Sequence, residues 1–164
     1  MNDASVEVEV EDPAWTSALP DAESVVERAA LAALDFISAH PRGFEGISGL
    51  EITVLLTDDA AVRALNGKFR GKDAATNVLS FPAPAFARPH LGDIALAYGV
   101  CAAEAEAQGK TLADHLAHLT VHGVLHLLGY DHEADDAAEA MEQMERAILK
   151  GLGVNDPYAQ GPDA

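Results

Sequence analysis

The pattern of apolar and polar positions along the chain predicts four β-strands. Valine alternates with glutamate over 6–10, and a period of two is typical of a strand with one face in water. A run of branched apolar residues over 50–56 predicts a buried strand, and two further runs over 77–81 and 91–98, next to proline or glycine, predict two more. We therefore expect a four-stranded sheet with the first strand at its edge.

Apolar residues that recur at helical spacing predict about five helices around this sheet. Thr57 is placed to cap a short helix that should end near Asn66-Gly67, and a loop through Lys72 should follow. Thr111 opens a later helix with a capping box, and Gly129 should end that helix. The predicted helices cover 21–40, 58–66, 99–108, 111–128 and 134–150.

Length and composition are those of one domain. The chain has 164 residues, 49% of them hydrophobic, which is enough for a single core. The first residues lack the basic and apolar stretches of a signal peptide, and no segment is apolar enough to span a membrane, so we expect a cytoplasmic protein. The single cysteine, Cys101, is expected to be a buried apolar side chain. We take 1–164 as one α/β domain, with disorder expected at 1–4 and 159–164.

The net charge of −17 is large and unevenly distributed. Such an acidic chain is not expected to coat nucleic acid without specificity, because neutralising phosphate requires lysine and arginine. Segment 61–90 is the exception, since it carries five lysines and arginines against a single acid. It is either a solvated face, the common role of a charged run, or the part of the chain that contacts phosphate.

Histidines cluster near the end of the helix predicted over 111–128. Five of the seven fall between positions 115 and 132, and those on the helix share an arc of roughly 80° at about 100° per residue. His122 and His126 lie one turn apart, so both can send a ring nitrogen to one ion about 2.0–2.1 Å away. The break at Gly129 lets His132 approach that ion from another direction. The sequence thus predicts a metal site formed by His122, His126 and His132.

Spacing alone also allows a different ligand set along one helix. His115, His118 and His122 could nearly face one ion, but His132 is preferred because the turn before it supplies a second direction of approach. His118 is then expected behind the ligands, and His115 on the surface and partly exposed. Asp131 could orient a ligand imidazole, although a solvated loop aspartate is about as common.

Three imidazoles leave one coordination position of a zinc ion open, which is the arrangement of a catalytic site. A water bound there loses a proton near neutral pH, and this favours hydrolysis. In zincin peptidases, the residue after the first histidine is a glutamate that acts as general base, whereas here it is Gly123. A peptidase is therefore less expected than an enzyme that cleaves phosphodiesters, where the metal can also neutralise phosphate charge.

The segment from His122 to His132, His-Gly-Val-Leu-His-Leu-Leu-Gly-Tyr-Asp-His, resembles the signature of the YbeY family of bacterial ribosomal RNA maturation endoribonucleases. Four further segments support the resemblance, which covers about 50–158: 65–73, 76–82, 91–94 and 152–158. The sequence departs from the family pattern at Asn77, where aspartate is usual, and at Phe69, where tyrosine is common.

The resemblance implies a mixed sheet flanked by helices, with a zincin-like site at the end of a central helix and one Zn²⁺ held by the three named histidines. It also implies cleavage of single-stranded RNA during small-subunit ribosomal RNA maturation, with Arg70 as a catalytic residue. A guanidinium can hold a phosphate through two parallel hydrogen bonds and stabilise developing charge. Lys68 and Lys72 are weaker candidates for substrate binding.

Two other functions agree with the same residues. The ion could serve hydrolysis of another substrate, such as a peptide or a small phosphoester, or it could brace a non-catalytic ribosome assembly factor. The acidic body suits docking on the basic proteins of the small ribosomal subunit, so the expected partners are ribosomal RNA and those proteins. We expect a monomer.

Overall fold

The computed structural model describes residues 4–39, 49–130 and 135–158. The strands are β1 (Ser5–Val10), β2 (Glu51–Thr57), β3 (Val78–Pro82) and β4 (His90–Ala97). The helices are α1 (Ala14–Ala18), α2 (Ala22–Ala39), α3 (Asp59–Arg70), α4 (Tyr98–Ala107), α5 (Leu112–Leu127) and α6 (Asp135–Gly151), with a short 3-10 turn, η1 (Ala85–Ala87). The predicted disorder of 1–4 and 159–164 concerns residues outside these ranges, apart from Ala4.

The four strands form one mixed sheet in the order β1-β2-β4-β3. β1, β2 and β4 run parallel, and β3 pairs antiparallel with β4. The predicted four-stranded sheet and the edge position of the first strand are confirmed. The opposite edge belongs to β3, and this edge becomes important below.

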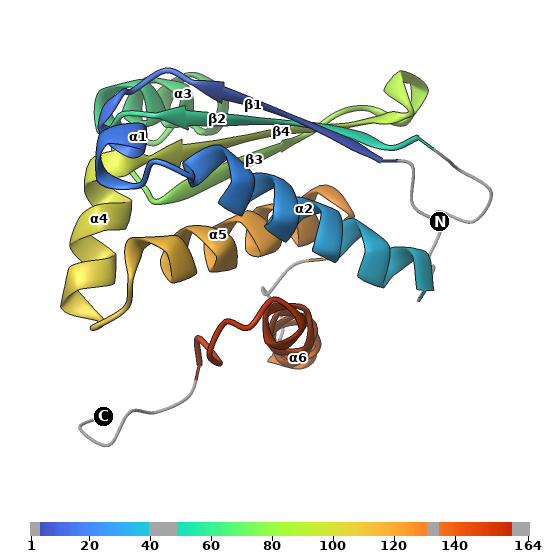
Figure 1. The fold of residues 1–164 in the computed structure, drawn as a ribbon. Coiled ribbons are helices and arrows are strands. Elements are labelled where there is room, and N and C mark those ends of the chain that lie inside the picture. Colours follow the sequence, from blue (N-terminus) through green and yellow to red (C-terminus); the bar gives the residue numbers. More distant parts are fainter. Residues whose placement is uncertain (1–3, 40–48, 131–134, 159–164) are drawn as a thin grey trace.

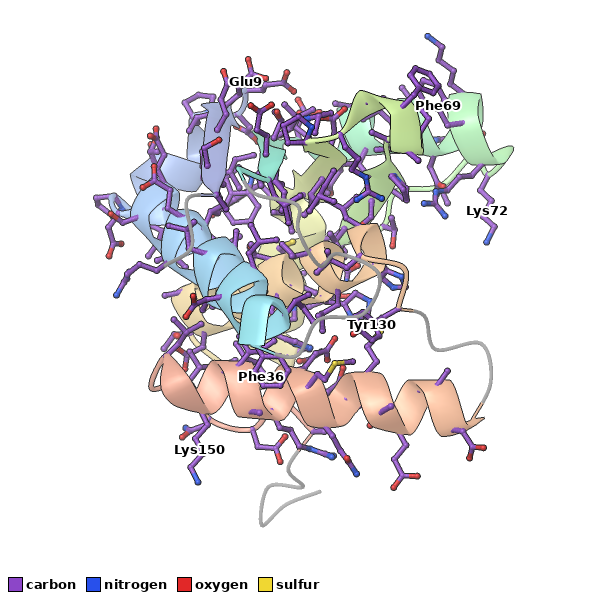
Figure 2. The ribbon with its side chains drawn as sticks, turned by 90° about the vertical axis from the view of Figure 1, so that its right-hand side faces the viewer. Glu9, Phe36, Phe69, Lys72, Tyr130 and Lys150 are labelled. Atoms are coloured by element: carbon purple, nitrogen blue, oxygen red, sulfur yellow. The ribbon has the colours of Figure 1, made fainter. Side chains whose placement is uncertain are left out.

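Helices cover both faces of the sheet (Figure 1). α2 and α5 lie side by side against one face, where Ile94 and Leu96 of β4 enter the main core. α3 packs on the other face against Ala95 and Ala97, because successive residues of a strand point to opposite faces. α6 forms a third layer beneath α2 and α5, with Phe36 of α2 facing it in Figure 2. Among the described residues, none of the helices combines the length and apolar character that crossing a bilayer requires.

α3 differs from its prediction at both ends. Its N-cap is Asp58, whose side chain accepts from the backbone N–H of Ala61, so the prediction of Thr57 was wrong. The helix also continues past Asn66 to Arg70 and ends at Gly71, which takes the left-handed conformation with φ 68°. Asn66 is buried and donates to the carbonyl of Ala74, so its side chain is used in packing and does not end the helix. The last turn of α3 therefore carries residues that were expected in a loop.

Candidate metal centre and the adjoining cavity

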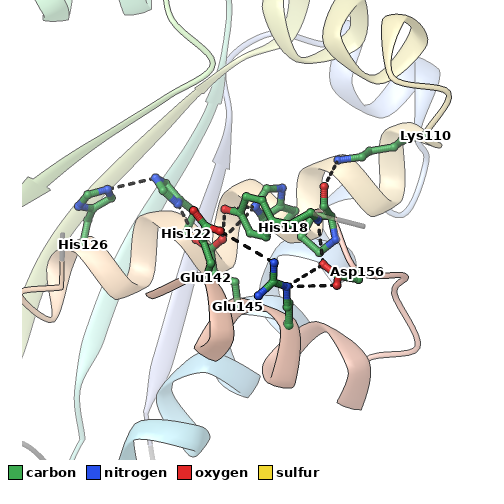
Figure 3. A network of polar contacts seen from close by, with 10 residues as sticks. Lys110, His118, His122, His126, Glu142, Glu145 and Asp156 are labelled. Atoms are coloured by element: carbon green, nitrogen blue, oxygen red, sulfur yellow. Dashed lines mark hydrogen bonds and ion pairs between the residues drawn. The ribbon is translucent and has the colours of Figure 1, made fainter. Parts of the chain in front are cut away.

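Two of the three predicted metal ligands face each other on the last turns of α5. The helix begins at Thr111, whose hydroxyl accepts from the backbone N–H of Asp114, as the capping box predicts. The Nε2 atoms of His122 and His126 lie 3.1 Å apart (Figure 3). Two nitrogen ligands of one tetrahedral zinc ion lie about 3.3 Å apart, because each Zn–N bond is about 2.0–2.1 Å long. This pair therefore fits two positions of a zinc site.

The third predicted ligand, His132, and Asp131 lie outside the described residues. Within the described ranges no group of three or more histidine, cysteine, aspartate or glutamate side chains gathers in the way a metal ion requires. The described part of the chain thus supplies a convergent pair, and the complete ligand set stays a prediction.

A fully buried carboxylate contacts His122, the first of the predicted ligands. Glu145 of α6 lies with Oε2 2.6 Å from Nδ1 of His122 (Figure 3). Burial alone would raise the pKa of this carboxyl, but the hydrogen bonds that it accepts outweigh burial and lower the pKa to about 2. An ionised carboxylate at Nδ1 keeps the proton on that nitrogen and leaves the lone pair of Nε2 for a metal.

Glu145 was not predicted from the sequence. It lies four residues after Met141 and three before Ile148, both buried, so it interrupts the apolar face of α6. A charged residue in an apolar stripe is the signal that could have revealed it, because buried carboxylates need partners.

The first two histidines of α5 take other roles. His118 lies with Nε2 3.2 Å from Oε1 of Glu145, the carboxylate that also contacts His122, so its position agrees with the prediction that it lies behind the ligands. His115 was predicted to be partly exposed, and this was wrong: it is 3% exposed, with Nε2 2.9 Å from Oε1 of Glu104 on α4. The alternative ligand set of His115, His118 and His122 is therefore disfavoured, because carboxylates occupy the Nε2 atoms of the first two.

His122 and His126 open onto a cavity of about 550 Å³ between α5 and the edge strand β3. Arg70 and Lys72 line it too, and among its described lining residues there is no carboxylate. Arg70 reaches it because α3 runs on to that residue, and its Nη2 donates to the carbonyl of Ser80 at 2.7 Å. The structure thus brings the predicted Arg70 and Lys72 to the two histidines.

Lys68 does not line this cavity. Its Nζ lies 5.1 Å from the ring centre of Phe69, which is 59% exposed and packs edge-on against Phe81. Figure 2 shows Phe69 and Lys72 projecting from the α3 corner of the molecule. Lys68 and Phe69 therefore form an outer ledge next to the cavity.

Gly123 is explained by packing. A Cβ atom on this residue would lie 3.0 Å from Cδ1 of Ile94 in β4, which is closer than side chains normally approach. Its carbonyl accepts the hydroxyl of Ser80 at 3.2 Å. The missing side chain lets α5 sit tightly on β3 and β4, and a larger residue here would require the Ile94 side chain to shift.

A larger hollow of about 790 Å³ lies on the surface around Arg63 and Asp73. These two exposed side chains bind each other at 2.6 Å. None of its described lining residues is a histidine, and the charges of Arg63 and Asp73 neutralise each other.

The chain is similar to known proteins of one family over most of its length. The family model described as endoribonuclease YbeY matches residues 16–153. The protein named endoribonuclease YbeY from Paramagnetospirillum magneticum is 48% identical over 94% of this chain and 96% of its own length. The protein of the same name from Azorhizobium caulinodans is 52% identical, also over 94% of this chain and 96% of its own length.

The fold is similar to the solution structure of TM1509 from Thermotoga maritima, with a TM-score of 0.53, 20% identity, and 95% of this chain and 100% of that chain covered. This likeness concerns the fold alone. The family model covers most of the chain, and the two relatives match it almost from end to end. The chain therefore belongs to the endoribonuclease YbeY family.

Proposed function

We propose that this chain is a zinc-dependent endoribonuclease that cleaves single-stranded RNA, with small-subunit ribosomal RNA as its substrate. The relatives that match almost the whole chain are named endoribonucleases. The observation that carries the proposal is that His122, His126 and Arg70 line one cavity. A metal-ligand pair and a phosphate-binding cation thus meet at one place.

The roles of the residues follow from their contacts. His122 and His126, with His132 as the third ligand, would hold the zinc ion, and Glu145 orients His122. When bound, zinc supplies a hydroxide at neutral pH and neutralises phosphate charge. Arg70 has five N–H donors, and the carbonyl of Ser80 engages one of them, so the guanidinium is held in place and can still bind a phosphate.

The edge of β3 argues against a peptide substrate. Asn77 and Ala83 form backbone hydrogen bonds with β4. The backbone N–H and carbonyl groups of the alternate residues Val78, Ser80 and Pro82 therefore point away from β4, to the open edge of the sheet. The N–H of Val78 already donates to the side chain of Asn77, and the carbonyl of Ser80 already accepts from Arg70. Pro82 has no N–H to donate. An extended peptide that pairs with this edge would therefore lose about half of its hydrogen bonds.

The outer ledge suits a single strand more than a duplex. Phe69 offers an exposed ring and Lys68 a cation beside it, and bases of single strands stack on such rings. Lys72 extends the positive charge into the cavity. We therefore place Lys68 and Lys72 in substrate binding.

The deciding experiment is cleavage of a labelled single-stranded RNA by protein of known zinc content, with a duplex RNA and a peptide as alternative substrates. Arg70→Ala is expected to lower kcat/KM about 10²- to 10³-fold, because it removes a donor to the developing charge. Arg63→Ala is the matched control, since Arg63 lies on the same helix and binds Asp73 outside the cavity. Equal rates in the two variants would contradict the role of Arg70, and cleavage of the peptide alone would overturn the nuclease proposal.

We further propose delivery by basic proteins of the small ribosomal subunit. The body is acidic, and Glu7, Glu9 and Glu11 lie exposed along β1 and just beyond it. Complementary charge speeds the encounter between proteins. Association with purified small subunits is expected to weaken with salt, and to keep most of its strength in Arg70→Ala. If that variant abolishes association, the RNA cavity, and not the acidic body, makes the contact.

A further inference from the structure

Hydrogen bonds hold the last described residues of the chain beside the candidate metal centre (Figure 3). Val154 returns to the end of α6 by a backbone bond to Leu149 of 2.9 Å. Asp156 binds Nε of Arg146 and accepts from the backbone N–H of Tyr158 at 2.8 Å. These bonds hold Tyr158 against α6, where its ring packs edge-on against His118 with 5.4 Å between ring centres.

Tyr158 meets the carboxylate that supports the first ligand. Its hydroxyl donates to Oε1 of Glu145, and the other oxygen of this carboxylate contacts Nδ1 of His122. The two oxygens belong to one rigid planar group, so a bond that fixes Oε1 also fixes the direction of Oε2. The contacts thus form a continuous path from the C-terminal segment through Glu145 to a metal ligand.

We infer that Glu145 and Tyr158 are positioning residues of the metal centre, and that the C-terminal segment raises metal affinity through them. The inference rests on the proposed metal site. Carboxylates behind a ligating histidine typically change metal affinity 10- to 100-fold, because they hold the ring orientation and tautomer. Tyr158 does not touch His122 or His126 in any described contact. Its hydroxyl bonds Glu145 and lies 3.3 Å from Nε2 of His118, which itself contacts Glu145, so we assign its effect to Glu145.

The experiment measures the zinc dissociation constant by competition with a chromophoric chelator, using full-length apo-protein. Glu145→Gln keeps the shape of the side chain and loses its charge, and is expected to weaken zinc binding about 10- to 100-fold. Tyr158→Phe removes the hydroxyl that bonds Glu145 and lies 3.3 Å from Nε2 of His118, and is expected to weaken zinc binding about two- to tenfold. Glu139→Gln, on the exposed side of α6, and Tyr98→Phe, whose ring packs on Trp15, are matched controls expected to bind as the wild type does.

The double variant tests the path. If Tyr158 acts through Glu145, adding Tyr158→Phe to Glu145→Gln changes the zinc affinity no further. An equal loss in both backgrounds would overturn the path, and wild-type affinity in both single variants would overturn the inference while leaving the metal site intact. If the wild-type chain binds no zinc, the metal site itself fails. Thermal melts of the apo-proteins separate loss of folding from loss of affinity, and Tyr158→Phe carries the test if Glu145→Gln does not fold.

Discussion

The two halves of the histidine row on α5 use one residue type for different purposes. In the first half, His115 is buried against Glu104 of α4, and burial lowers the pKa of its ring. In the second half, the Nε2 atoms of His122 and His126 face each other at 3.1 Å on a cavity. The helical spacing is similar in both halves, so the elements packed against each turn decide what each histidine does.

A carboxylate accompanies both halves, but from different directions. Glu104 contacts Nε2 of His115, the nitrogen farther from the backbone, so this nitrogen is not available to a metal ion. Glu145 contacts Nδ1 of His122 and leaves Nε2 directed at His126. The nitrogen that the carboxylate engages thus separates a structural histidine from a candidate ligand.

The difference between the two halves of the row is tested most strongly by His126→Ala, for which we expect the largest loss of zinc affinity. Removing one of three ligands should weaken zinc binding by more than about 100-fold and abolish RNA cleavage. The apo-protein should lose less than about 1 kcal/mol of unfolding free energy, since the side chain lines a cavity. Metal content after dialysis and a denaturant titration of the apo-protein check both parts. Undiminished zinc content would remove His126 from the site.

The reverse outcome is expected for His115→Ala. The change leaves a void in the core and takes a partner from Glu104, so the apo-protein should lose about 2 kcal/mol of unfolding free energy. Zinc affinity should stay within about twofold, because the ring is not a ligand. A large loss of zinc affinity without a loss of stability would restore the alternative ligand set on α5.

A smaller effect is expected from Asn77→Asp, which places a second carboxylate beside Glu104. The amide of Asn77 donates to Oε1 of Glu104 at 3.0 Å, the atom that His115 also contacts. A carboxylate in its place repels Glu104, and we expect a loss of about 1 kcal/mol at pH 7. Denaturant titrations of the two apo-proteins measure the loss, and added salt should reduce it by screening the repulsion. A loss that salt leaves unchanged would show that repulsion is not its cause.

The sequence predicted those features that depend on neighbours along the chain. Alternating valines and glutamates placed β1 at an edge, and the capping box placed the start of α5 at Thr111. The spacing of His122 and His126 predicted their convergence. Each of these follows from backbone periodicity, which a sequence displays directly.

The features that it did not predict depend on partners from distant elements. His115 was expected at the surface because its partner Glu104 belongs to another helix, and Glu145 drew no notice because its partners come from α5 and the C-terminal segment. Asn66-Gly67 resembles a helix end, but the bond from Asn66 to Ala74 overrides that local signal. Tertiary contacts routinely outweigh such local preferences.

The smallest effect concerns pH and sharpens the difference between the halves. Burial lowers the pKa of His115 below its ordinary value of 6.5, so the unfolded chain takes up a proton at this residue more readily than the folded chain does. The stability that His115 contributes is therefore fully present above about pH 6.5 and is lost as pH falls through that value towards the lower folded-state pKa. Apo-protein stability should fall between pH 7 and pH 5.5, and fall less in His115→Gln. An equal decline in the two proteins would mean that other groups cause it, and that His115 titrates in the folded chain as it does in the unfolded one.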